Sequence, residues 1–141
     1  MTTRKFALVF GVLFLLIGIA GFIPQLVPGM HPEHPALTLD ANAGQLLGLF
    51  PVNLLHNIVH ILFGLWGLAV SGSVGGARLY GRGVAIVYLV LTIAGFVPAL
   101  QTGFGLVPLW GNDIWLHALL ALIAAYFGWL HRDHVASPTA V

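Results

Sequence analysis

Residues 48–60 read GLFPVNLLHNIVH, and residues 105–117 read GLVPLWGNDIWLH. The two stretches align without gaps at an offset of 57, so His60 falls on His117 and His56 falls on Asp113. An earlier pair, IAGFIP at 19–24 and IAGFVP at 93–98, aligns at an offset of 74. The chain is therefore predicted to contain two copies of one structural unit, with polar residues at matching places.

The composition indicates that the surface of this protein faces lipid. Hydrophobic residues make up 59% of the 141 residues and charged residues 6%, with a mean hydropathy of +0.99. A water-soluble domain carries about 25% charged residues, and so few charges cannot cover a water-facing surface. The net charge of +1 is too small to favour nucleic-acid binding. The absence of cysteine excludes disulfides, thiolate catalysis and sulfur metal sites.

Four apolar runs, none of which contains Lys, Arg, Asp or Glu, predict the membrane helices. Their ranges are 6–27, 54–70, 84–100 and 114–130. The last three have 17 residues each, near the short end of what crosses about 30 Å of hydrocarbon. In lipid the backbone must satisfy its own hydrogen bonds, so spanning runs are helical. We expect one all-α transmembrane domain over 1–141, a polytopic four-helix bundle with an outer loop at 28–53, a cytoplasmic loop at 71–83 and a tail at 131–141.

The basic residues predict the orientation of the bundle. All five lie before the first run, between the second and third, or after the fourth: Arg4, Lys5, Arg78, Arg82 and Arg132. By the positive-inside rule, both termini are therefore cytoplasmic. The glycines of the loop 71–83 predict a flexible connector. The outer loop is expected to start extended at its prolines and to form a short interfacial helix from Asp40 to Leu47.

Spans one and three then run in the same direction, as do spans two and four, so the two-helix repeats are parallel. Polar and then small residues follow one face of span two and the matching face of span four. Small residues let membrane helices approach closely. We therefore predict that spans two and four pack against each other, with His60 and His117 at similar depth. The two faces are His56, His60, Gly64 and Gly67, and Asp113, His117, Ala121 and Ala124.

The polar residues at the outer end of these faces allow three interpretations. The favoured one is structural, with hydrogen bonds joining the two halves. The second is a zinc or copper site, since imidazole and carboxylate groups suit both ions and His-x-x-x-His on a helix is ligand spacing. The third is haem bound between the two aligned histidines. The structural cluster would comprise Asn53, His56, Asn57, His60, Asn112, Asp113 and His117, and the metal ligands would be His56, His60, His117 and Asp113.

The sequence contains no evident catalytic constellation. Asn57 stands where zinc proteases carry a glutamate. Serines 71, 73 and 137 are expected on the cytoplasmic side, away from the outer histidines. No charge lies in the middle of a predicted span, where transport residues usually sit. We therefore expect a protein that is not an enzyme.

The run from Leu46 to His60, with Ala77–Tyr80 and Asn112–His117, resembles the signature of the domain of unknown function 4383 family. This resemblance covers roughly residues 6–129 and implies a small bacterial membrane protein with four helices. It brings no established activity, ligand or catalytic residue. Similar proteins are frequent in actinobacteria and cyanobacteria, which implies a bacterial cell membrane or a photosynthetic membrane. His31 and His34 lie outside this pattern, so the resemblance gives them no role.

Together these features lead us to expect a structural or accessory subunit of a larger bacterial membrane complex, without a cofactor. Four short helices bury little surface, and a small chain gains stability from partners or from a second copy of itself. The expected partners are the lipid bilayer and such a complex or homo-oligomer, and not nucleic acid. The alternatives are a zinc- or copper-binding membrane protein using the outer His/Asp cluster, and a haem- or pigment-binding bundle.

Overall fold

A computed structural model of the chain describes residues 1–133, which are mostly helical. Three helical stretches are long and apolar enough to cross a membrane, namely Thr3–Ala20, Val74–Phe96 and Asn112–Leu130, and Leu54–Val70 is a shorter apolar helix. Of the predicted tail 131–141, residues 134–141 lie outside the described residues. In order, the elements are α1 (Thr3–Ala20), η1 (Pro24–Leu26), β1 (Gly44–Leu46), β2 (Phe50–Val52), α2 (Leu54–Val70), α3 (Val74–Phe96), η2 (Pro98–Leu100), α4 (Asn112–Ala125) and η3 (Tyr126–Leu130), which continues α4 as a π-helix.

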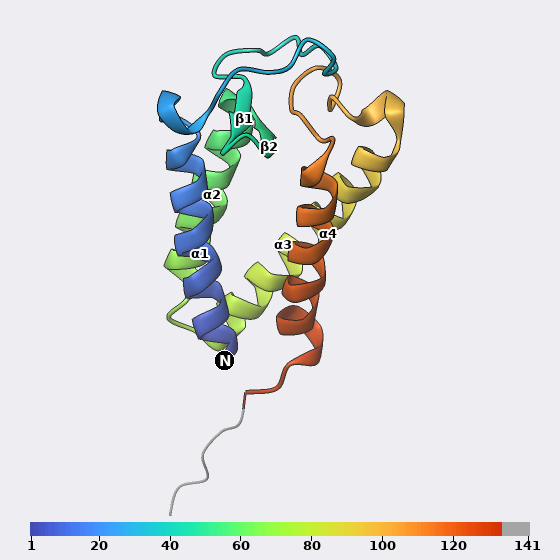
Figure 1. Ribbon diagram of the computed structural model, residues 1–141. Coiled ribbons are helices and arrows are strands. Elements are labelled where there is room, and N and C mark those ends of the chain that lie inside the picture. Colours follow the sequence, from blue (N-terminus) through green and yellow to red (C-terminus); the bar gives the residue numbers. More distant parts are fainter. Residues whose placement is uncertain (134–141) are drawn as a thin grey trace, which may run out of the picture.

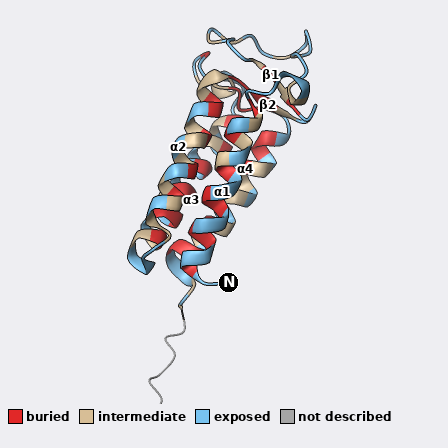
Figure 2. Ribbon diagram, turned by 90° about the vertical axis from the view of Figure 1, so that its left-hand side faces the viewer, coloured by how far each residue is buried: buried red, intermediate tan, exposed pale blue. Residues whose placement is uncertain are grey.

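The helices form two hairpins, α1 with α2 and α3 with α4, that stand beside each other (Figure 1). Buried residues line their facing sides and exposed residues the outside (Figure 2). Many of the exposed residues are large and apolar. The core between the hairpins is largely aromatic. The rings of Phe6 and Phe127 stack at 4.6 Å, and those of Phe14 and Tyr88 at 5.4 Å. This core joins α1 to α3 and η3, while the buried residues Asn53, His56 and Asn57 lie at the start of α2, directly after β2.

The small residues pack within each hairpin, so the prediction that they join spans two and four is wrong. A Cβ on Gly64 would lie 2.7 Å from the backbone nitrogen of Leu15 and 2.9 Å from the carbonyl of Gly11, both on α1. On the other hairpin, a Cβ on Gly81 would lie 3.1 Å from the carbonyl of Ala124. Each pair of consecutive helices therefore forms its own close backbone contact.

The third helix begins ten residues before the predicted position, so the predicted cytoplasmic loop 71–83 is wrong. Ser73 caps α3, because its hydroxyl accepts a hydrogen bond from the amide of Gly76 at 3.1 Å. Two glycines that indicated flexibility instead allow close packing. Gly81 faces Gly128, and a Cβ on Gly83 would collide with the ring of Trp66. Residues 71–73 are the whole connection between α2 and α3.

The other boundaries differ by less. The first helix begins at Thr3, where Thr2 accepts a hydrogen bond from the amide of Lys5, and ends at Ala20 instead of residue 27. Pro24 then starts a 3-10 turn, because it has no N–H to continue the α-helix. The third helix ends at Phe96 rather than at residue 100, and the fourth begins at Asn112, two residues early.

The outer loop contains a β-hairpin in place of the predicted helix from Asp40 to Leu47. Strands β1 and β2 pair antiparallel, with Gly44 opposite Val52 and Leu46 opposite Phe50. The turn between them uses positive φ angles at Leu47 and Gly48, of 55° and 71°, which no helix allows. Because β2 ends directly before Asn53, this hairpin leads the chain into the first turn of α2.

Candidate metal centre

Asn53 anchors the start of α2 to the loops that precede α2 and α4. Its side-chain oxygen accepts a hydrogen bond from the amide of His56 at 2.9 Å, which caps the helix. Its amide group donates to the carbonyls of Leu39 and Leu106, at 2.9 and 2.7 Å. The side chain is completely buried. Asn53 thereby places His56 close to the loop that precedes α4.

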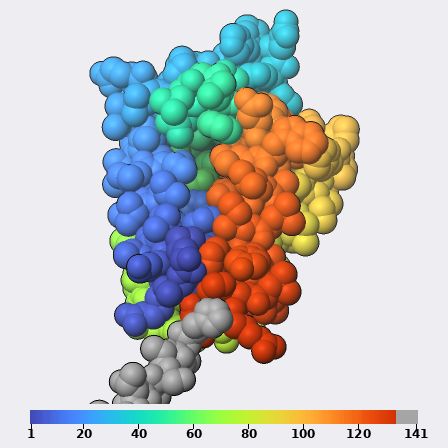
Figure 3. Space-filling view, turned by 60° about the horizontal axis from the view of Figure 1, so that its bottom comes forward, coloured from blue at the N-terminus to red at the C-terminus, as the bar shows by residue number. Residues whose placement is uncertain are grey.

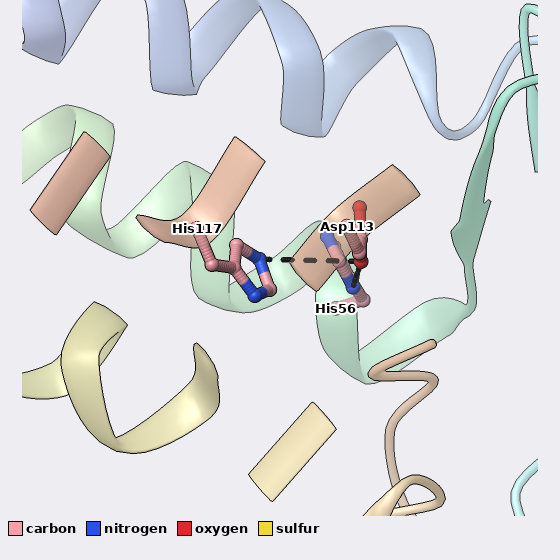
Figure 4. A group of neighbouring side chains, drawn as sticks. All are labelled: His56, Asp113 and His117. Atoms are coloured by element: carbon pink, nitrogen blue, oxygen red, sulfur yellow. Dashed lines mark ion pairs between the residues drawn. The ribbon is translucent and has the colours of Figure 1, made fainter. Parts of the chain in front are cut away.

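His56, Asp113 and His117 converge in the first turns of α2 and α4, at the end of the bundle that carries the β-hairpin (Figure 4). The Asp113 Oδ2 atom lies 3.9 Å from His56 Nδ1 and 3.9 Å from His117 Nε2. One potential ligand atom from each residue lies within 4.8 Å of the other two. All three residues are buried, with Asp113 only 2% exposed. The carboxylate thus lies between two imidazoles, one from each helical hairpin.

The hydrogen-bonding capacity of this group is incompletely used. Neither imidazole nitrogen is close enough to the Asp113 carboxylate for a hydrogen bond, since such bonds require about 3.2 Å or less. Among the described residues, Asp113 Oδ2 and His117 Nδ1 are buried without a hydrogen-bond partner. Asp113 lies in the first turn of α4, where the free amides of the helix favour a negative charge. The site therefore combines a buried carboxylate with room for a positive charge beside it.

His60 lies one turn below His56 and outside this group of three. Its ring stacks on that of His56, with centroids 4.5 Å apart and planes inclined by 8°. Its Nδ1 lies 3.0 Å from the backbone carbonyl of His56. A carbonyl can only accept, so Nδ1 carries the proton and Nε2 keeps its lone pair. Of the four residues predicted as metal ligands, three therefore converge, and His60 presents a free nitrogen nearby.

The remaining polar residues of the predicted cluster contact other parts of the protein. Asn57 donates to the carbonyl of Gly21 at 2.9 Å and so joins α2 to the end of α1. Asn112 is exposed and donates to the carbonyl of Leu49 at 3.2 Å. In the outer loop, the ring of His34 lies 5.9 Å from that of Trp110. Neither His31 nor His34 belongs to the group of three that could hold an ion.

Tyr88 of α3 belongs to the surroundings of the site and was missed in the sequence. Its ring meets that of His117 edge-on at 4.9 Å and that of His60 at 6.5 Å. The residue is 1% exposed, so its ring fixes the position of His117 from the side of the core. A tyrosine within an otherwise apolar span was the available signal, because its hydroxyl is costly to bury without a polar neighbour.

The sequence of the chain matches the family described as Domain of unknown function (DUF4383) over residues 4–130. The chain belongs to this family. The match confirms the resemblance seen in the run that ends at His60, and it extends over all four helices. No curated protein and no solved structure matches the chain. The geometry of its own site is therefore the evidence for the function of this DUF4383 protein.

Proposed function

We propose that this DUF4383 protein binds a divalent transition-metal ion through His56, Asp113 and His117, with zinc as the best fit. The observation that carries the proposal is the spacing of 3.9 Å between the carboxylate oxygen and each imidazole nitrogen. That spacing is too long for a direct hydrogen bond and suits an ion lying between the groups. Two imidazoles and one carboxylate form a ligand set that zinc uses in proteins.

The distances require an adjustment of the side chains around an ion. Zinc lies about 2.0–2.2 Å from its nitrogen and oxygen ligands in a tetrahedral arrangement, so two ligand atoms are about 3.4 Å apart. The two pairs at 3.9 Å are slightly wider than this, and all three atoms lie within 4.8 Å of one another. Side-chain rotations that draw the three atoms together by about 0.5–1.4 Å would complete the site.

The surroundings also favour a cation over a purely structural cluster. A carboxylate buried among apolar groups is strongly destabilised unless a partner compensates its charge. The hydrogen-bonded cluster predicted from the sequence would supply that compensation through short contacts to Asp113. The contacts found at its Oδ2 are the two at 3.9 Å, within the described part of the chain. A bound divalent ion would compensate the charge directly.

We propose that the metal centre lies at the outer face of the membrane. The basic residues in the first turns of α1 and α3 lie at the opposite end, where Arg4 donates to the carbonyl of Ser71 at 3.1 Å. The positive-inside rule makes that end cytoplasmic. Labelling of single cysteines with an impermeant reagent in whole cells tests this orientation. Ala36→Cys should react from outside and Gly72→Cys only after lysis, and the reverse pattern would contradict the proposal.

Contacts at matching positions support the proposed internal repeat. Gly21 packs against Asn57, and Gly95 packs against Ile114. The offset of 74 takes Gly21 to Gly95, and the offset of 57 takes Asn57 to Ile114. These are the two offsets that align the sequence with itself. In the first hairpin Asn57 donates a hydrogen bond to the carbonyl of Gly21, whereas Ile114 fills the equivalent place with apolar contacts. A duplicated hairpin whose copies have diverged would account for these contacts.

The two other expectations from the sequence have less support. The cavity beside the histidines has a volume of about 140 Å³, well below the roughly 300–1,000 Å³ of pockets for larger ligands, which disfavours haem. An accessory role in a larger complex is compatible with a metal site and stays a prediction. Purification in mild detergent tests it: a stoichiometric partner would support the accessory role, and a homogeneous single species would contradict it.

Zinc binding by the purified protein tests the proposed function. Equilibrium dialysis against zinc, followed by metal analysis, should give one ion per chain. Asp113→Asn and His117→Asn should lose the ion, because the amide oxygen and nitrogen are poor zinc ligands. His34→Asn is the matched control, since it removes a histidine of the same outer end that lies outside the site. Equal zinc binding by all three variants would overturn the proposal.

A further inference from the structure

A small cavity adjoins the two histidines of the proposed metal centre. Its volume is about 140 Å³, and His56, His60 and His117 form its polar wall. Tyr88 and apolar side chains, including Leu91, form the remainder. Asp113 is not part of this wall, although it lies between the two histidines. An ion held by all three residues would therefore have its carboxylate ligand on one side and the cavity on the other.

The number of protein ligands leaves room for another ligand. Structural zinc sites are closed by four protein side chains, whereas sites with three protein ligands hold a fourth, exchangeable ligand, usually water. A water molecule occupies about 30 Å³ in the liquid, so the cavity has space for several. Its size also limits the ligand to a few atoms.

His60 provides a partner for such a ligand. Its Nδ1 is held by the carbonyl of His56, which leaves the lone pair of Nε2 as the free acceptor of a side chain that lines the cavity. A water molecule bound to the ion could donate a hydrogen bond to this nitrogen. The stacking of His60 on His56 holds the two rings at a fixed separation of 4.5 Å.

We infer that the ion bound by His56, Asp113 and His117 keeps one coordination position open toward this cavity, where it takes water or a small anion in contact with His60. The inference rests on the proposed metal binding and deepens it, because it separates an accessible metal centre from a closed structural one. His60 in this arrangement is a positioning residue, not a ligand of the ion.

Cobalt substitution tests the inference, because the visible bands of Co²⁺ report both its binding and its coordination. The protein should take up Co²⁺, and titration with azide should then change the bands in a saturable manner. Leu91→Phe should keep the cobalt bands and lose the azide response, because the larger ring fills the cavity. Val90→Phe is the matched control, since Val90 is 59% exposed on the same helix, and it should behave as the wild type.

The outcomes separate this inference from the proposed function. If cobalt does not bind, the metal site itself is refuted. If cobalt binds and the wild type ignores azide while His60→Ala responds to it, His60 is the fourth ligand and the inference is overturned. If both ignore azide, the position is closed and the inference is also overturned. A response that Leu91→Phe retains would place the open position away from the cavity and contradict the inference.

Discussion

Asp113 is the residue on which the account of the site depends. It lies 3.9 Å from two imidazole nitrogens that come from different hairpins, and it is almost completely buried. Without an ion, a carboxylate in this position should destabilise the fold, whereas a neutral side chain of the same shape should not. With an ion, the same carboxylate becomes one of three ligands. The two interpretations of the cluster therefore predict opposite effects for one substitution.

We predict that Asp113→Asn leaves the metal-free protein as stable as the wild type, or more stable. Added zinc should raise the thermal unfolding temperature of the wild type and not that of the variant. At free zinc about one hundred times above its Kd, the stabilisation should be about 2.7 kcal/mol. Thermal unfolding in detergent with and without chelator measures both effects. A strong destabilisation of the metal-free variant would instead support the hydrogen-bonded cluster.

Asn53 tests how the site is positioned. Asn53→Ala removes the cap of α2 and leaves the carbonyls of Leu39 and Leu106 without their donor. We expect a loss of about 2–4 kcal/mol in the free energy of unfolding, measured by denaturant titration in micelles. Asn112→Ala is the control, because this exposed residue makes one longer bond of 3.2 Å, and it should cost less than about 1 kcal/mol. Equal losses would contradict the role of Asn53.

The sequence predicted which residues form the site better than it predicted why they meet. The alignment of His60 with His117 indicated a shared depth, and the spacing of four placed His56 and Asp113 one turn above. The small residues below them suggested a close contact between spans two and four, which the structure does not have. The polar ends of the helices meet because Asn53 donates hydrogen bonds to the carbonyls of Leu39 and Leu106, in the loops before α2 and α4. A long-range bond to a carbonyl has no counterpart in sequence pattern.

At the scale of the elements, a glycine can indicate either a flexible loop or a close packing contact, and the sequence alone does not distinguish the two. Four helices were predicted, and residues 1–133 contain four α-helices, as expected for apolar runs that satisfy their backbone hydrogen bonds internally. The start of α3 was missed because its glycines suggested a flexible loop. Gly81 and Gly83 instead meet Gly128 and Trp66, so their lack of a side chain serves packing. Which neighbour a glycine meets depends on tertiary structure.

We predict opposite effects for two alanine substitutions of glycine. Gly64→Ala should destabilise the protein by about 1–3 kcal/mol, because the new methyl group would press on the backbone of α1 at 2.7 Å. Gly75→Ala should stabilise it by about 0.4–1 kcal/mol, since a Cβ there meets nothing within 4 Å and the unfolded chain loses freedom. The free energy of unfolding of each variant, measured in micelles, compares the two substitutions. Similar effects would show that the close α1–α2 contact does not limit the fold.

At the scale of the whole molecule, the two ends of the described chain close the bundle at the end opposite the candidate metal centre. The amide of Thr3 donates to Asp133 Oδ1 at 2.8 Å, and His131 Nε2 lies 3.4 Å from the same oxygen. Figure 3 shows the start of α1 against the end of the last helix. This contact joins the first hairpin to the second, as the aromatic core does further inside.

Stability should depend on pH through this contact. The hydrogen bond from the Thr3 amide lowers the pKa of the Asp133 carboxyl, which lies outside the membrane-spanning segments. A lowered pKa means that the contact stabilises the fold above the unfolded value of about 3.9 and is lost as the pH falls through the folded value. The unfolding temperature of the wild type should therefore fall more steeply below about pH 5 than that of Asp133→Asn. Parallel curves would contradict the role of this carboxylate.

The coordination of bound zinc tests the central claim most directly. X-ray absorption at the zinc edge, recorded on the purified protein after dialysis, reports the number and kind of ligands. We predict two imidazole nitrogens at about 2.0–2.1 Å, with oxygen ligands from Asp113 and one water, and no bound zinc in Asp113→Asn. A zinc shell without imidazole, or a wild-type protein that retains no zinc, would contradict the account.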